Sequence, residues 1–257
     1  MPSPRRRTRA AAATVLTTAL LSSVWTGGVA GAATTPPDGP GGSLRSAAAF
    51  GRLPAATPVA PPAMYGKSDP SADGVYRQSL AIVALASADA RPAPQAVEWL
   101  LAQQCADGGF ATYRADPGVP CDVAREDTVA TSIAVQALVS LRTYATQAGR
   151  GADWLKSKQL PDGSYAAFPG APAPVGDPTS TAFAVNALVA TGVNPDTQKT
   201  AQGRTPADAL KSMQVVCPAP TEALGAFRGA AGGAGDPLVT ARATLALGYG
   251  KLPAVPT

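Results

Sequence analysis

The residues best suited to acid–base chemistry are two aspartates, Asp127 and Asp177, which each stand directly before a predicted helix. A carboxyl group at the mouth of an apolar cavity could donate a proton to a substrate. Asp236 precedes a third such helix, and Pro178 and Pro237 follow two of the three aspartates. Aspartate followed by proline is typical of a helix N-cap and first helical position. We therefore expect all three aspartates to cap helices, and a proton-donor role for Asp127 or Asp177 is the alternative.

The chain contains no histidine, and this absence removes several classes of chemistry at once. Ser-His-Asp and Cys-His nucleophile systems, imidazole acid–base catalysis and histidine-ligated zinc all require that side chain. Glu126 and Asp127 form the only acidic pair beside a predicted cap, and the neighbouring Arg125 could pair with either. We expect a non-catalytic protein with no metal and no cofactor.

Three segments of the chain end in a glutamine at intervals of 55 residues: WLLAQQ, WLKSKQ and ALKSMQ. Each glutamine is followed by a turn and an aromatic residue. An Asp-Gly pair favours a turn, and a glutamine amide can satisfy unpaired groups at helix ends. The tryptophans are expected to pack between helices. We interpret the set as architectural, and its members are Trp99, Gln104, Asp107, Gly108, Phe110, Trp154, Gln159, Asp162, Gly163, Tyr165, Gln214 and Phe227.

The hydrophobic pattern after residue 73 predicts an all-α fold of alternating helices. Apolar residues recur at helical spacing, and no long segment alternates with a period of two. Each helix pair buries only part of its apolar surface, so neighbouring pairs must stack. The expected helices cover roughly 77–88, 94–104, 128–144, 150–159, 179–191, 205–214 and 237–248.

The two segments Gln104–Phe110 and Gln159–Tyr165 resemble the repeats of the squalene/oxidosqualene cyclase and prenyltransferase superfamily. The resemblance covers about residues 74–250 and implies an α/α toroid, here an incomplete ring of about 3.5 repeats. The chain lacks the Asp-x-Asp-Asp acid motif of the cyclases, the zinc-binding histidine of protein prenyltransferases and a Cys-Gly-Glu-Gln thioester. Secreted cobalamin carriers also resemble it distantly. The family therefore implies binding of a corrinoid-like or isoprenoid-like ligand.

The N-terminus has the pattern of a secretory signal over residues 1–32. Four arginines precede an apolar run of about 15 residues and a group of small residues, with cleavage expected near Ala30 or Ala32. The run is shorter than the roughly 20 residues that cross a bilayer, so we expect no membrane span in the mature chain. Residues 33–72 are rich in Pro, Gly, Ala and Ser and are expected to form a disordered linker with a marginal helix at 44–50, before a repeat domain at 73–253.

Removal of the signal leaves 17 basic and 17 acidic residues, which argues against a nucleic-acid partner. Three cysteines remain, and a disulfide fits an exported protein. Cys105 and Cys121 are closest in sequence and lie in one inter-helix connection, so we favour that pair. The two pairings that involve Cys217 stay open, and Cys217 would otherwise be a free or intermolecular thiol.

The connection between about residue 111 and Asp127 is the least repetitive part of the domain. Long connections on repeat scaffolds often carry function. We expect an exported protein that binds a small apolar or amphipathic ligand, or a partner protein of the cell envelope, and the oligomeric state stays open. The alternatives are a terpene-cyclase-like enzyme and a scaffold that dimerises through the open end of the ring. The candidate ligand-binding residues are Tyr113, Arg114, Asp127, Tyr165, Phe168 and Asp177.

Overall fold

The expected helices are present in the computed structural model, which describes residues 63–219, 221–229 and 235–252. These residues contain no β-strand, so the all-α class is confirmed for the described part of the chain. The expected signal, the linker up to residue 62 and its marginal helix lie outside these ranges. The α-helices are α1 (Gly74–Ser87), α2 (Pro94–Ala102), α3 (Thr128–Ser140), α4 (Ala145–Ser157), α5 (Pro178–Ala190), α6 (Pro206–Ser212) and α7 (Pro237–Leu247), with short 3-10 helices η1 (Val123–Arg125), η2 (Pro195–Thr197) and η3 (Thr221–Ala223).

The helix boundaries follow the capping residues closely. The side chains of Asp127, Asp177 and Asp236 each accept a hydrogen bond from a backbone N–H in the first turn of α3, α5 and α7, at 2.6–2.9 Å. The helix expected to end near residue 144 stops at Ser140, because Arg142 adopts a left-handed backbone conformation with φ of 60°. The chain then starts α4 at Ala145, five residues before the expected position.

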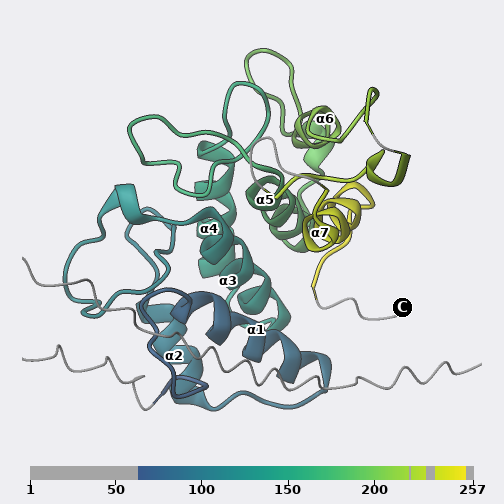
Figure 1. Cartoon of the computed structure of the whole chain (residues 1–257). Helices are drawn as coiled ribbons and strands as arrows, with labels where there is room; N and C mark the ends of the chain where they lie inside the picture. Colours follow the sequence, from purple (N-terminus) through teal and green to yellow (C-terminus); the bar gives the residue numbers. More distant parts are fainter. Residues whose placement is uncertain (1–62, 220, 230–234, 253–257) are drawn as a thin grey trace, which may run out of the picture. The chain divides into compact units, whose positions relative to one another are not determined.

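The seven helices form two alternating sets. Helices α1, α3, α5 and α7 are packed each against the next, and Figure 1 shows them in this sequence order. Helix α2 contacts α1, α4 contacts α3 and α5, and α6 contacts α5 and α7. Helices α3 and α5 are buried around most of their circumference, so their sequences lack a one-sided apolar stripe.

The repeated glutamines tie the end of one helix to the chain that follows. The side-chain amide of Gln104 donates to the carbonyl oxygens of Gly108 at 3.0 Å and Gln147 at 2.9 Å. The Gln159 amide donates in the same way to Gly163 at 3.1 Å and to Gln198 at 3.3 Å. Gln214 makes only the local bond, to Gly225 at 3.3 Å.

The aromatic residue after each turn is buried and held by a threonine of the next helix. Phe110, Tyr165 and Phe227 are at most 1% exposed. Their backbone N–H groups donate to the hydroxyls of Thr131, Thr181 and Thr240 at 2.9–3.0 Å. Their carbonyl oxygens accept from the N–H of the following capping aspartate at 2.8–3.0 Å. One hydrogen-bond pattern therefore occurs three times in the described residues.

The two ends of the described chain return to the helices. The buried Gln78 of α1 donates to the carbonyl of Ala63 and accepts from the N–H of Tyr65, which holds the last part of the expected linker against α1. At the other end, Asn186 of α5 donates to the carbonyl of Gly250 at 2.6 Å. None of the described helices has the length and apolar character needed to cross a membrane.

Candidate functional site

The long connection between α2 and α3 is folded back on itself by a disulfide. The predicted bond between Cys105 and Cys121 is present, and Cys217 is a free, exposed cysteine. Arg114 lies inside this loop and donates to four backbone carbonyl oxygens at 2.6–3.3 Å, those of Ala102, Gln104, Pro117 and Val119. The disulfide and this arginine together fix the loop against the end of α2.

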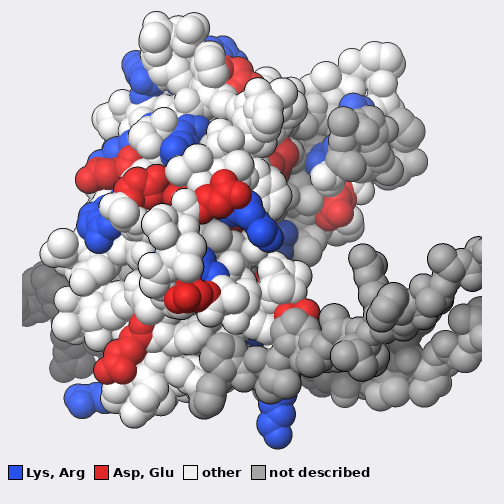
Figure 2. All heavy atoms as spheres, turned by 90° about the vertical axis from the view of Figure 1, so that its left-hand side faces the viewer, with Lys and Arg blue, Asp and Glu red and all other residues white. Residues whose placement is uncertain are grey.

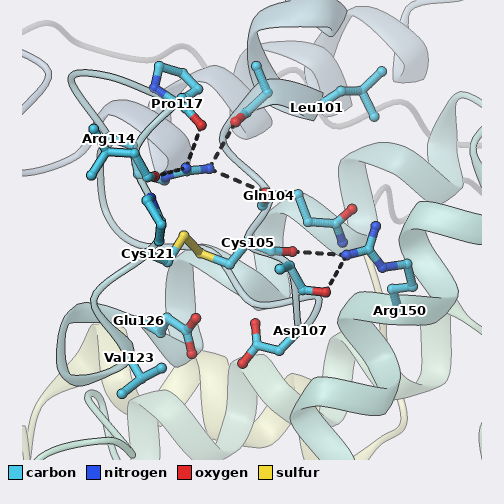
Figure 3. A pocket seen from close by; sticks show the side chains of 15 residues that line it. Leu101, Gln104, Cys105, Asp107, Arg114, Pro117, Cys121, Val123, Glu126 and Arg150 are labelled. Carbon is cyan, nitrogen blue, oxygen red and sulfur yellow. Dashed lines mark hydrogen bonds between the residues drawn. A yellow bond between two sulfur atoms is a disulfide. The ribbon is translucent and has the colours of Figure 1, made fainter.

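A pocket of about 630 Å³ lies between this loop, the end of α2 and α4, and we call it the disulfide pocket. Figure 3 shows the disulfide across its centre, with Leu101 and Pro117 on one side and Val123 and Glu126 on the other. The lining combines apolar side chains with a few charged ones. Its members are Leu101, Ala102, Gln104, Cys105, Ala106, Asp107, Arg114, Pro117, Gly118, Val119, Pro120, Cys121, Val123, Glu126 and Arg150.

Glu126 is the buried charged group of this pocket. It is 1% exposed, and its Oε2 accepts a hydrogen bond from Trp154 Nε1 at 2.9 Å. Burial raises the pKa of the Glu126 carboxyl, the hydrogen bond from Trp154 opposes this shift, and the negative charge of Asp107 adds to it. Figure 3 shows the carboxyl groups of Glu126 and Asp107 pointing toward one another. The pocket therefore contains a pair of interacting carboxyl groups.

The two arginines of the pocket are committed to backbone carbonyls. Arg150 of α4 donates to the carbonyl oxygens of Cys105 at 3.0 Å and Ala106 at 2.8 Å. Arg114 makes the four bonds given above. Within the described ranges the ion pairs are Arg77–Asp73 and Lys156–Asp153, so neither Asp107 nor Glu126 has an ion-pair partner there. The carboxyl pair is thus left without a neutralising cation at contact distance.

The candidate ligand residues do not converge on one site. Tyr113 lines a second, smaller pocket of about 310 Å³ in the same loop, and its ring stacks on Trp99 with ring centroids 6.4 Å apart. Arg114 lines both this pocket and the disulfide pocket. Tyr165 is in the core, where its hydroxyl has no hydrogen-bond partner among the described residues. Phe168 is 44% exposed on the connection between α4 and α5.

Asp127 and Asp177 lie close to one another at the starts of α3 and α5. Burial raises the pKa of Asp127, backbone hydrogen bonds from Ala130 and Val129 oppose the shift, and the charge of Asp177 adds to it. Both carboxyl groups accept helix N–H bonds, so both serve as N-caps in this structure. Neither lines the disulfide pocket.

Three potential metal ligands meet in the lining of the pocket, Cys105, Cys121 and Glu126, and their ligand atoms lie within 4.8 Å of one another. The thiolate is the form of cysteine that binds metals, and the disulfide removes both thiolates. In the oxidised protein this cluster therefore offers a single carboxylate, which does not make a metal site.

Glu126 and Arg150 were not among the candidate ligand residues predicted from sequence. A signal for Glu126 is present in the repeats: the residue before the capping aspartate is Gly176 in the second copy and Gly235 in the third, but Glu126 in the first. Each of these three residues pairs with the chain just after the buried aromatic, in the bridges Ala111–Glu126, Ala166–Gly176 and Arg228–Gly235. Glu126 therefore stands where the other two copies have glycine, and this difference could be read from the aligned repeats.

The face that carries the α2–α3 connection has mixed charge. Figure 2 shows acidic side chains distributed among Lys and Arg over the described part of this face. Comparisons with known proteins give no assignment, because no protein-family model matches the sequence and no curated protein matches it significantly.

Proposed function

We propose that this chain is an exported, non-catalytic repeat protein of the α/α-toroid type whose disulfide pocket binds a small amphipathic ligand. The main support for this proposal is the presence of the disulfide pocket. Its volume of about 630 Å³ is within the range of about 300–1,000 Å³ that ligand pockets usually have. Apolar walls with a few fixed polar groups are also typical of such sites.

The toroid architecture is supported by the order of the helices. In such a fold, inner helices contact one another around the centre and outer helices alternate with them. The contacts of α1, α3, α5 and α7 each with the next, and the alternation of α2, α4 and α6 with them along the chain, support this proposal over the described residues. Export is supported by the N-terminal sequence pattern and by the disulfide, which forms and persists in oxidising compartments. A corrinoid-like or isoprenoid-like ligand is suggested by the family resemblance alone.

The test is native mass spectrometry of the mature protein purified from its own secreting culture. We expect an adduct of defined mass that is lost in Val123→Trp, because Val123 lines the pocket and a tryptophan there would fill it. The matched control is Val175→Trp, at an exposed position on the α4–α5 connection that lies outside the pocket. Retention of the adduct in Val123→Trp, or a bare wild-type protein, would contradict the proposed site.

A second candidate function, self-association, is favoured by the outer face of α7. Leu238 is 58% exposed and Leu245 38%, and Tyr249 just after the helix is 40% exposed, so α7 and the residues that follow it present apolar side chains that no further described hairpin covers. Sedimentation velocity tests this alternative. A dimer that dissociates in the Leu238→Lys, Leu245→Lys double variant would support a scaffold, and a wild-type monomer at high concentration would refute it.

A further inference from the structure

The first copy of the repeat differs from the second at two positions that lie close together. The second copy has Ser164 after its Asp-Gly turn and Gly176 before its capping aspartate, and the first copy has Gly109 and Glu126 at these places. A Cβ atom on Gly176 would overlap the Ser164 hydroxyl, so in the second copy only glycine fits. In the first copy Gly109 has no side chain, which leaves space for the side chain of Glu126.

Trp154 occupies the rest of that space and positions the carboxyl group. Its indole N–H donates to Glu126 Oε2, and the ring lies so close to Gly109 that an added Cβ would be 2.5 Å from Nε1. Trp154 donates to Oε2, and the other oxygen of Glu126 points toward Asp107 and the pocket (Figure 3), where a hydrogen bond between the two carboxyl groups also raises the pKa of Glu126. Glu126 is 99% buried, and when both carboxyl groups are ionised its second oxygen accepts no hydrogen bond from the described residues.

The charges around the pocket favour a cation at this oxygen. Arg114 donates to four backbone carbonyls and Arg150 donates through Nη2 to two, and within the described ranges neither forms an ion pair with Glu126 or Asp107. The positive charge of Lys158 lowers the pKa of Glu126 slightly against the larger shift from burial. The Lys158 ammonium group, however, lies 5.4 Å from the centroid of the Trp154 ring, and Lys158 does not line the pocket. Two neighbouring carboxylates without a contact cation are stabilised by a positive charge placed between them.

We propose that the disulfide pocket binds a protonated amine, whose ammonium group lies between Glu126 and Asp107 and whose apolar body contacts the walls of the pocket. This inference rests on the proposed function and names its ligand class. An organic amine fits better than a bare ion, because the pocket is far larger than an ion and Leu101, Val119 and Val123 give it apolar walls. A hydrogen bond between charged partners in such a site is worth more than a neutral one.

The experiment is isothermal titration calorimetry of the mature protein with three probes of similar shape: phenethylamine, phenethyl alcohol and phenylacetate. We expect the amine to bind about tenfold or more tightly than the alcohol, and phenylacetate to bind most weakly. Glu126→Gln keeps an acceptor for Trp154 and removes the charge, so it should abolish the preference for the amine. Asp107→Asn should reduce that preference, since it keeps the turn and removes the second charge.

The matched control is Asp162→Asn, at the repeat equivalent of Asp107 and outside the pocket, which should leave the preference unchanged. Equal affinities for amine and alcohol in the wild-type protein would overturn the amine inference, as would an amine preference that survives Glu126→Gln. Failure of all three probes to bind would also overturn it. The native adduct and its loss in Val123→Trp decide the proposed function separately, because they do not depend on the charge of the ligand.

Discussion

The side-chain amide of Gln104 donates to the carbonyl oxygen of Gln147, which lies 43 residues further along the chain. This bond joins the end of α2 to the first turn of α4 across the turn that carries Asp107. Gln159 makes the equivalent bond to Gln198, whereas Gln214 makes only a local one. The repeated glutamine therefore fixes one helical hairpin on the next.

The glutamine bonds predict a graded loss of stability. Gln104→Ala and Gln159→Ala each remove one hydrogen bond to a turn carbonyl and one to a distant carbonyl, so we expect each to lower the free energy of unfolding by about 1–3 kcal/mol. Gln214→Ala removes a single bond and should cost about 1 kcal/mol or less. Urea denaturation followed by circular dichroism measures all three. Equal losses at the three positions would mean that the long-range bonds contribute nothing.

Replacing each of two glycines of α4 by alanine should change the stability of the protein in opposite directions. A Cβ on Gly149 would have no atom within 4 Å, so Gly149→Ala should stabilise the protein by about 0.5–1 kcal/mol through better helix propensity. A Cβ on Gly151 would overlap a methyl group of the buried Val135, so Gly151→Ala should destabilise it by about 1–3 kcal/mol. Thermal denaturation of the pair provides its own control. A stabilised Gly151→Ala variant would show that α4 does not lie this close to α3.

Replacing the buried Tyr165 by phenylalanine should stabilise the core. Its hydroxyl is buried without a partner among the described residues, and burial also raises the pKa of that hydroxyl. Phe110 and Phe227 occupy the same position in the other copies. Tyr165→Phe should therefore raise the free energy of unfolding by about 1 kcal/mol or more, and Phe110→Tyr should lower it. Chemical denaturation checks both, and a destabilised Tyr165→Phe would indicate a partner for the hydroxyl.

The disulfide should stabilise the loop that forms the pocket. It joins residues 16 apart, for which chain-entropy arguments give about 3 kcal/mol. We expect the Cys105→Ser, Cys121→Ser double variant to lose about that much stability and to lose ligand binding. Cys217→Ser is the control and should change neither property, because Cys217 is exposed and outside the pocket. Unchanged ligand binding in the double variant would show that the pocket binds its ligand without the disulfide.

The raised pKa of Glu126 predicts a pH dependence of stability. A carboxyl whose pKa is higher in the folded chain binds its proton more tightly there, so its favourable contribution is complete below the ordinary pKa of 4.5. That contribution is lost as the pH rises from 4.5 through the raised pKa. The free energy of unfolding of the wild type should therefore fall relative to Glu126→Gln over this interval. The exposed Glu98→Gln variant is the control, and parallel curves for wild type and Glu126→Gln would refute the shift.

Much of the scaffold could be predicted from the sequence because it depends on local signals that recur. Asp177-Pro178 and Asp236-Pro237 mark helix starts by their own hydrogen-bonding chemistry, and the predicted pairing of Cys105 with Cys121 was right. The sequence predicts an end of α3 near residue 144, which is too late, because a left-handed conformation at Arg142 has no residue-type signal comparable with glycine.

The pocket could not be predicted in the same way. Asp107 and Glu126 are 19 residues apart in a connection without a periodic pattern, and they meet because the bridge Ala111–Glu126 and the bond from the Asp127 N–H to the Phe110 carbonyl bring that connection back to the turn. The sequence predicts a turn residue at Asp107, and its Oδ1 does accept a hydrogen bond from the N–H of Gly109 in the turn. Its second role, beside a buried carboxyl, follows only from the three-dimensional arrangement.

The most direct test of ligand binding in the disulfide pocket is a crystal structure of the mature protein purified from its own secreting culture, with nothing added. We expect electron density for a non-protein group between Val123 and Leu101 that extends to Glu126. A pocket that contains only ordered water, or that is closed by the protein's own side chains, would contradict it.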